Sequence, residues 1–117
     1  MQNHPITPSS LRAGNLIKSA SNGARTIVSE EDAVSLNFKR ECMMGKQFGF
    51  PISDEILTQC LGFQMVMDDK FEKRTPDVVV VVEKRDEKYF VFGIHVEVAH
   101  ILQGLFFYAT GKELIAA

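Results

Sequence analysis

The chain has 117 residues and a formal net charge of −2, with 45% hydrophobic and 24% charged residues. This composition is ordinary for one globular domain and argues against a disordered or fibrous chain. The longest aliphatic run, 78–82, is much shorter than the ~20 residues of a membrane-spanning helix, so we expect no membrane protein. Residues 1–10 lack the basic start and apolar core of a secretory signal. We therefore expect a cytoplasmic protein with a flexible N-terminal arm (1–10) and a single domain (11–117).

A β-hairpin is predicted at the start of this domain. Residues 11–19 and 24–29 are the expected strands, and Asn22-Gly23 between them favours a two-residue turn because both residues tolerate positive φ. Short strands of this kind indicate a small antiparallel β-unit similar to an SH3-like barrel.

Residues 29–38 allow two interpretations. Ser29 is a good N-cap for a short acidic helix, whereas the alternating apolar residues of 33–38 fit a strand. The alternation favours the strand, and residues 39–50 are then expected to form a loop.

The middle of the chain predicts a short helix. Ser53 is its expected N-cap, and Gly62 ends it because glycine tolerates the left-handed conformation of a C-terminal cap. Ile56 and Leu57 would lie on its buried side.

Strands follow this helix. A strand is expected at 63–67, a charged loop at 68–76, and a hairpin at 77–82 and 89–96 joined by the polar residues 83–88. The five consecutive valines indicate either a strand covered on both faces or one face that meets a partner.

A long helix is predicted near the C-terminus, ending at Thr110-Gly111. Helical spacing places Val98, Leu102, Leu105 and Ala109 on one apolar face, which we expect to be buried.

The opposite face of that helix is the predicted interaction surface. It carries His100, Gln103, Gly104 and Phe107, so an aromatic ring sits in a polar surface beside a glycine that permits close approach. One interpretation is that another segment, such as residues 1–10, covers Phe107. A second is a contact with a protein partner or a second copy of the chain, and a third is a histidine-based site.

Three blocks of the sequence share a pattern. They are LRAGNLI at 11–17, PISDEIL with a following GF at 51–63, and HILQGL with a following TGKEL at 100–114. Together they resemble a family of small uncharacterised proteins common in Bacteroidetes genomes and in their phages and mobile elements. The resemblance implies no known activity and therefore no catalytic residues.

Candidate chemistry is sparse. His95, Glu97 and His100 match no metal-ligand spacing, and Cys42 and Cys60 match no zinc or redox motif. The glycines form no phosphate-binding loop. We predict no catalytic residue, no metal and no cofactor, and reduced cysteines, although the sequence leaves their pairing open.

Charge is distributed unevenly. Residues 1–50 carry six Lys/Arg and four Asp/Glu, whereas residues 51–117 carry seven and eleven. Neither half has the basic excess typical of nucleic-acid binders, so the charge disfavours that function. The candidate nucleic-acid contacts are the six basic residues of the first half: Arg12, Lys18, Arg25, Lys39, Arg40 and Lys46.

The overall expectation is an α+β fold in which the antiparallel β-unit and a C-terminal β-hairpin pack against two helices. The predicted core is Leu16, Ile27, Leu36, Ile56, Leu57, Val80, Phe92, Leu102, Leu105 and Ala109. The favoured function is a non-enzymatic protein-interaction module. The alternatives are a nucleic-acid-binding protein and a small enzyme with an unfamiliar site.

Overall fold

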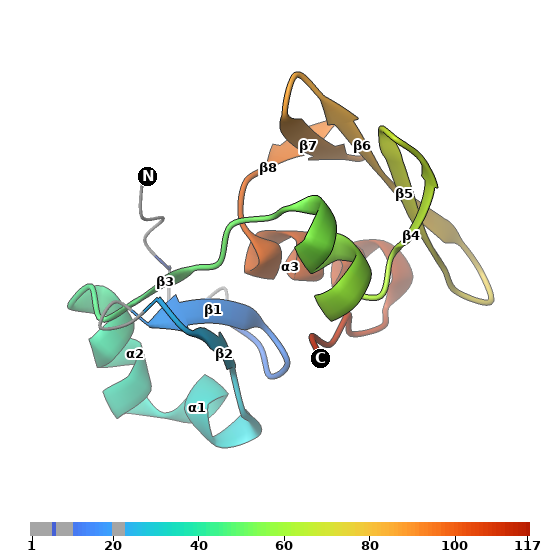
Figure 1. The fold of residues 1–117 in the computed structure, drawn as a ribbon. Helices are drawn as coiled ribbons and strands as arrows, with labels where there is room; N and C mark the ends of the chain where they lie inside the picture. Colours follow the sequence, from blue (N-terminus) through green and yellow to red (C-terminus); the bar gives the residue numbers. More distant parts are fainter. Residues whose placement is uncertain (1–5, 7–10, 20–22) are drawn as a thin grey trace.

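The computed structural model describes residues 6, 11–19 and 23–117. Two antiparallel sheets, of three and five strands, pack with four helical segments (Figure 1). The predicted α+β class is confirmed. The strands of the first sheet, as far as the chain is described, form an open sheet and no closed barrel.

The first sheet has the order β2-β1-β3, and all its pairs are antiparallel. Its strands are β1 (Leu16–Ser19), β2 (Arg25–Ile27) and β3 (Gln47–Gly49). The hairpin of β1 and β2 agrees with the prediction, although Asn22 of its expected turn lies outside the described residues. The expected loop at 39–50 is wrong at both ends, because residues 39–43 are helical and β3 pairs with β1.

The strand predicted at 33–38 is also wrong. Helices α1 (Glu30–Val34) and α2 (Leu36–Met43) occupy this region. The Ser29 hydroxyl accepts a hydrogen bond from the Asp32 amide at 3.0 Å, and the Ser35 hydroxyl accepts one from the Phe38 amide at 3.2 Å. Two consecutive N-caps therefore stabilise helices where the apolar alternation suggested a strand.

The predicted middle helix is present as η2 (Ile56–Cys60), a π-helical turn. The Ser53 hydroxyl accepts a hydrogen bond from the Ile56 amide at 3.1 Å, as an N-cap should. Gly62 follows with φ +73°, which ends the helix in the left-handed region.

The second sheet is a meander of five strands in sequence order. They are β4 (Gln64–Met67), β5 (Lys70–Arg74), β6 (Val79–Arg85), β7 (Lys88–Val91) and β8 (Ile94–Val96). The predicted hairpin of 77–82 and 89–96 is therefore the centre of a larger sheet. Its second strand is wrong as one element, because a turn at Phe92-Gly93 divides it into β7 and β8.

Residues 68–76 are not the expected charged loop, because they contain β5. A single fully buried residue, Phe71, holds this strand against the core, while its charged neighbours Lys70 and Arg74 remain exposed. The expected polar link at 83–88 is only the turn Asp86-Glu87, and both of its residues have positive φ.

The last helix, α3 (Ala99–Thr110), ends as predicted at Gly111, which has φ +73°. Its buried face differs from the expected one. Ala99, Leu102 and Phe106 are buried, whereas Ala109 is exposed. The helix is therefore rotated about its axis relative to the prediction.

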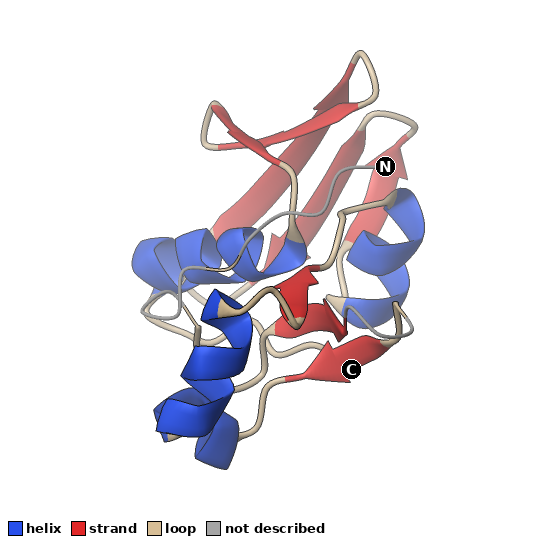
Figure 2. Cartoon of the chain, turned by 90° about the vertical axis from the view of Figure 1, so that its left-hand side faces the viewer, coloured by secondary structure: helices blue, strands red, loops and turns tan. Residues whose placement is uncertain are grey.

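Two apolar clusters organise the molecule. Leu16 joins a large cluster formed by η2, α3 and one face of the second sheet, whereas its neighbour Ile17 joins a smaller cluster with Phe38 and Cys42 of α2. Consecutive strand residues point to opposite faces, so β1 lies between the two clusters. Figure 2 shows α3 and η2 against one side of the five-stranded sheet, with α1 and α2 at the far end of the molecule.

The predicted core is therefore partly correct. Leu16, Ile56, Leu57, Val80 and Leu102 are buried, and Leu105 is partly buried against them. Four expected core residues are exposed instead: Ile27, Leu36, Phe92 and Ala109.

Candidate functional site

Gln103, one of the four residues of the predicted interaction surface, is a buried structural residue. Only 1% of it is exposed. Its Nε2 donates to the carbonyl oxygens of Gly14 and Leu114, both at 2.7 Å, and its Oε1 accepts from the Leu16 amide at 2.8 Å. One side-chain amide thus joins α3 to β1 and to the C-terminal segment.

His100 is buried as well, against the first sheet. A Cβ added to Gly49 of β3 would lie 3.1 Å from His100 Cε1 and 2.8 Å from Val98 Cγ1. Glycine at position 49 therefore lets β3 approach the start of α3 closely.

Phe107 is half-buried, and Arg12 covers its ring. The guanidinium carbon lies 3.9 Å from the ring centroid, and Arg12 Nε donates to Glu113 Oε1 at 2.8 Å. This hydrogen bond raises the pKa of the Arg12 guanidinium. The expected cover by residues 1–10 lies outside the described residues, except for Ile6.

The predicted interaction surface is therefore corrected. Its four residues do not form an exposed patch, because His100 and Gln103 belong to the interior and Arg12 lies over Phe107. At Gly104 the space around a built Cβ is open within the described chain, so no other segment approaches the helix there.

The six basic candidates do not converge on one surface. Arg12 is engaged with Glu113 and Phe107, and Arg25 Nη1 lies 2.7 Å from Cys60 Sγ. Lys18 lies directly opposite Arg25 in one neighbouring strand and Phe48 in the other.

The remaining three, Lys39, Arg40 and Lys46, lie on α2 and just after it. None of them forms an ion pair with a carboxylate of the described residues.

The structure contains one polar cluster that the sequence did not predict. Tyr89 donates its phenolic hydrogen to Asp54 Oδ1 at 2.6 Å, and Lys84 Nζ lies 3.3 Å from Asp54 Oδ2. Burial, followed by the hydrogen bond to Asp54, raises the pKa of Tyr89. The phenol therefore stays protonated at neutral pH and ties the start of η2 to the sheet. No spacing in the sequence signals this contact, since the partners come from different elements.

The other candidate ligands are dispersed. His95 Nδ1 lies 3.8 Å from Glu97 Oε1, and the described residues contain no group of three or more His, Cys, Asp or Glu side chains placed to hold a metal ion. Cys42 and Cys60 are free and buried in different clusters, and burial raises the pKa of the Cys42 thiol.

Two exposed apolar surfaces stand out instead. The first, here called the α1–α2 surface, consists of Val34, Leu36, Met43 and Met44, with Leu36 80% and Met43 76% exposed. The seven-residue spacing of Leu36 and Met43 would have revealed it, had the helix been predicted.

The second, here called the β4 turn surface, lies at the opposite end of the chain's fold. It consists of Met65, Val66 and Met67 of the edge strand β4 and the turn residues Asp68 and Asp69, all exposed. Met65 lies opposite Phe71 and Met67 opposite Lys70, so the two methionines lie on different faces of the strand.

Comparison of the chain with protein-family models, with curated proteins and with solved structures finds no match. In the described part of the chain, no helix has the length and apolar character needed to cross a membrane. Function must therefore be inferred from the chain's own surfaces and buried groups.

Proposed function

We propose that this chain is a non-enzymatic protein-interaction module that binds its partner through the α1–α2 surface. The observation that carries the proposal is the exposure of three apolar side chains on two consecutive helices and of Met44 at the C-cap of the second. Exposed apolar patches of this kind commonly mark protein contacts. Methionine side chains also adapt to partners of different shape, which suits a binding surface.

The geometry of α2 supports this role. Leu36 and Met43 project from one side of the helix, while Phe38 and Cys42 on the other side hold it to the smaller cluster. Burying a leucine or methionine side chain contributes about 1.5–3 kcal/mol, so these two residues alone could supply a substantial part of a micromolar affinity.

Other observations support the non-enzymatic role and its setting. The polar groups of the Tyr89–Asp54–Lys84 cluster bind one another and join η2 to the sheet, which is a structural role. The separation of two free cysteines into different clusters supports a reducing cytoplasm. The resemblance of residues 11–114 to the Bacteroidetes family supports an association with phages or mobile elements.

The test is a pull-down from an extract of the source cell with the double variant Leu36→Lys/Met43→Lys. We expect a partner that wild-type protein retains after nuclease treatment and that the double variant loses. Because both residues are exposed, the thermal midpoint should remain nearly unchanged.

Tyr108→Lys is the matched control, because Tyr108 is equally exposed but lies on α3. This variant should retain the partner. Equal retention by the double variant would remove the α1–α2 surface from consideration.

A second candidate function, nucleic-acid binding, is favoured by one observation. Lys18, Arg25 and Phe48 form a cross-strand row on one face of the first sheet, where cations can contact phosphates and the ring can stack on a base. Titration with a fluorescent single-stranded oligonucleotide at two salt concentrations checks it. We expect binding that weakens steeply with salt and is lost in Lys18→Glu; salt-independent or absent binding excludes this candidate.

A further inference from the structure

We propose that Ile6 is an autoinhibitory side chain, which fills an apolar site that a protein partner occupies in its place. The site, here called the Ile6 site, is the part of the smaller cluster formed by Ile17, Val28, Phe38 and Cys42. The partner that fits it presents an aliphatic side chain on an uncharged segment. The Ile6 site is separate from the α1–α2 surface, because Phe38 and Cys42 lie on the other side of α2.

Ile6 is buried although it lies near the start of the chain. Only 5% of it is exposed, and it shares the smaller cluster with side chains of β1 and α2. Burial of an isoleucine is favourable because it removes a large apolar surface from water. The cluster therefore accepts an aliphatic side chain from a segment outside its helices and strands, and Ile6 shows what kind of ligand fits.

Apolar burial alone holds Ile6 in this site. Among the residues that the structure describes, none forms a hydrogen bond with Ile6. Val28 of the same cluster differs, because its amide donates to the Asn15 carbonyl at 2.9 Å and its carbonyl accepts from the Gly14 amide at 2.7 Å. Ile6 therefore leaves the cluster without breaking a hydrogen bond of the described fold. Openings that break few contacts have low free energies.

The sequence around Ile6 defines the chemistry of the partner. Residues 1–10 contain no Lys, Arg, Asp or Glu, and Pro5 and Pro8 flank Ile6. Proline restricts a free chain, so fixing a side chain between two prolines costs less conformational entropy. A partner segment with an aliphatic residue between prolines and without charge fits the site for the same reason.

Ile6 competes with such a partner from within the same molecule. A covalently attached group has a high effective concentration at its site, in the millimolar range for short flexible connections. The affinity for the partner is therefore reduced by the fraction of molecules in which Ile6 has left the site. Replacing Ile6 with a smaller residue removes this competition.

Alkylation of Cys42 by iodoacetamide in the full chain reports on the Ile6 site. Cys42 is 4% exposed, so its thiol reacts only when the cluster opens, and Cys60 in the larger cluster is the internal reference. Mass spectrometry of the digested protein gives both rates. We expect Cys42 to react at least about tenfold faster in Ile6→Ala than in wild type, because the variant lacks most of the side chain that closes the site. An unchanged rate would overturn the proposal.

Val82→Ala separates this local opening from unfolding of the whole protein. Val82 is fully buried in the larger cluster, so the substitution promotes global unfolding and should accelerate Cys60. Cys42 should keep its wild-type rate, because release of Ile6 leaves the larger cluster intact. An equal acceleration of both cysteines would mean that Cys42 reacts only after global unfolding, which overturns the proposal.

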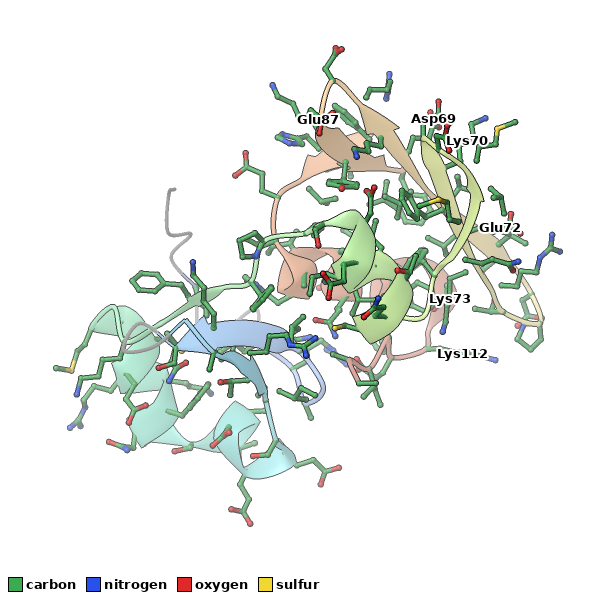
Figure 3. The ribbon with its side chains drawn as sticks, in the orientation of Figure 1. Asp69, Lys70, Glu72, Lys73, Glu87 and Lys112 are labelled. Carbon is green, nitrogen blue, oxygen red and sulfur yellow. The ribbon has the colours of Figure 1, made fainter. Side chains whose placement is uncertain are left out.

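Lys70→Ala is the surface control. Figure 3 shows Lys70 at the tip of the β4–β5 turn, and Figure 1 places that turn at the other end of the molecule from α2. This variant should change neither rate.

A peptide with the sequence of residues 1–10 tests whether the emptied site accepts a side chain from another molecule. In Ile6→Ala, this peptide at roughly 10 mM should slow the alkylation of Cys42 at least about twofold, since one isoleucine side chain gives only millimolar affinity. The same peptide with Ile6→Ser should not protect Cys42, and neither peptide should protect it in wild type, where Ile6 fills the site. No protection in Ile6→Ala, or equal protection by both peptides, overturns the proposal.

The concentration of wild-type protein identifies the source of Ile6. The rate of Cys42 should not depend on it, because Ile6 fills the site of its own chain. A rate that falls with rising protein concentration would show that a second copy supplies Ile6, which overturns the autoinhibitory contact. These outcomes do not depend on the α1–α2 surface, which Leu36→Lys/Met43→Lys tests separately.

Discussion

Residues that look alike in the sequence have different roles in this structure. Gln103 and Phe107 both lie on the polar side of α3, yet Gln103 is buried with three hydrogen bonds to two other segments, and Phe107 lies under Arg12. A buried amide is stable only where its donors and acceptors are satisfied, and Gln103 meets this condition. Its role is therefore to hold the fold together.

Gln103→Leu should destabilise the protein strongly. The substitution preserves volume but leaves the Leu114 carbonyl and the Leu16 amide without this partner, and it leaves the Gly14 carbonyl with the Ala116 amide alone. We expect the free energy of unfolding to fall by about 3 kcal/mol, measured by urea denaturation. A change below that of the exposed substitution Tyr108→Ala would contradict the structural role.

Two glycines should respond in opposite directions to alanine. At Gly49 the new Cβ would lie 2.8 Å from Val98 Cγ1, so the unfolding free energy should fall by about 1–3 kcal/mol. Gly104 lies inside α3 with no described atom within 4 Å of a new Cβ, and alanine favours helix there. Gly104→Ala should therefore stabilise by about 0.5–1 kcal/mol. Thermal denaturation of the pair checks both signs, and equal signs would contradict this account.

At the scale of elements, local hydrogen bonds decided what apolar patterns left open. The N-caps Ser29 and Ser35 stabilise helices in a segment whose alternating apolar residues predicted a strand. β5 was missed for the opposite reason, because its signal is one buried residue, Phe71, among charges. Its strand character comes from pairing with β4 and β6, which no local pattern encodes.

The Tyr89–Asp54 contact gives the protein a specific pH dependence. The pKa of Tyr89 is raised above its ordinary value of 10.0, so the folded state holds this proton more tightly than the unfolded state does. The resulting stabilisation is complete below pH 10 and is lost as the pH rises above it.

Tyr89→Phe isolates this effect. The variant should be less stable by about 1 kcal/mol at pH 7, and its deficit should shrink as the pH rises above 10. Urea denaturation of both proteins at a series of pH values checks the prediction. A deficit that grows with pH would show that the sign is wrong.

At the scale of the whole molecule, the C-terminal segment closes the larger cluster. Leu114 and Ala116 are buried, and the amides of Ala116 and Ala117 donate to the carbonyls of Gly14 and Cys60 at 3.0 and 2.9 Å. This segment links β1, α3 and η2, so its contribution should extend to all three.

Truncation after Gly111 tests that role. Removing 112–117 exposes the neighbours of Leu114 and removes two backbone hydrogen bonds, so we expect a loss of at least about 3 kcal/mol. Native-state hydrogen exchange should show faster exchange in β1 and α3. Unchanged exchange rates in β1 and α3 would mean that the C-terminal segment does not stabilise these elements.

The sequence alone determined the α+β class, the hairpin of β1 and β2, the Ser53 cap and the end of α3 at Gly111. These features depend on groups within a few residues of one another, so local chemistry is sufficient to predict them. Only the tertiary structure decided which face of α3 is buried, since Gln103 finds Leu16 87 residues away. It likewise decided that Leu36 and Met43 face outward, because the smaller cluster holds α2 by Phe38 and Cys42 and leaves its other side uncovered. The candidate site followed from that packing, which depends on contacts between distant segments that no local spacing encodes.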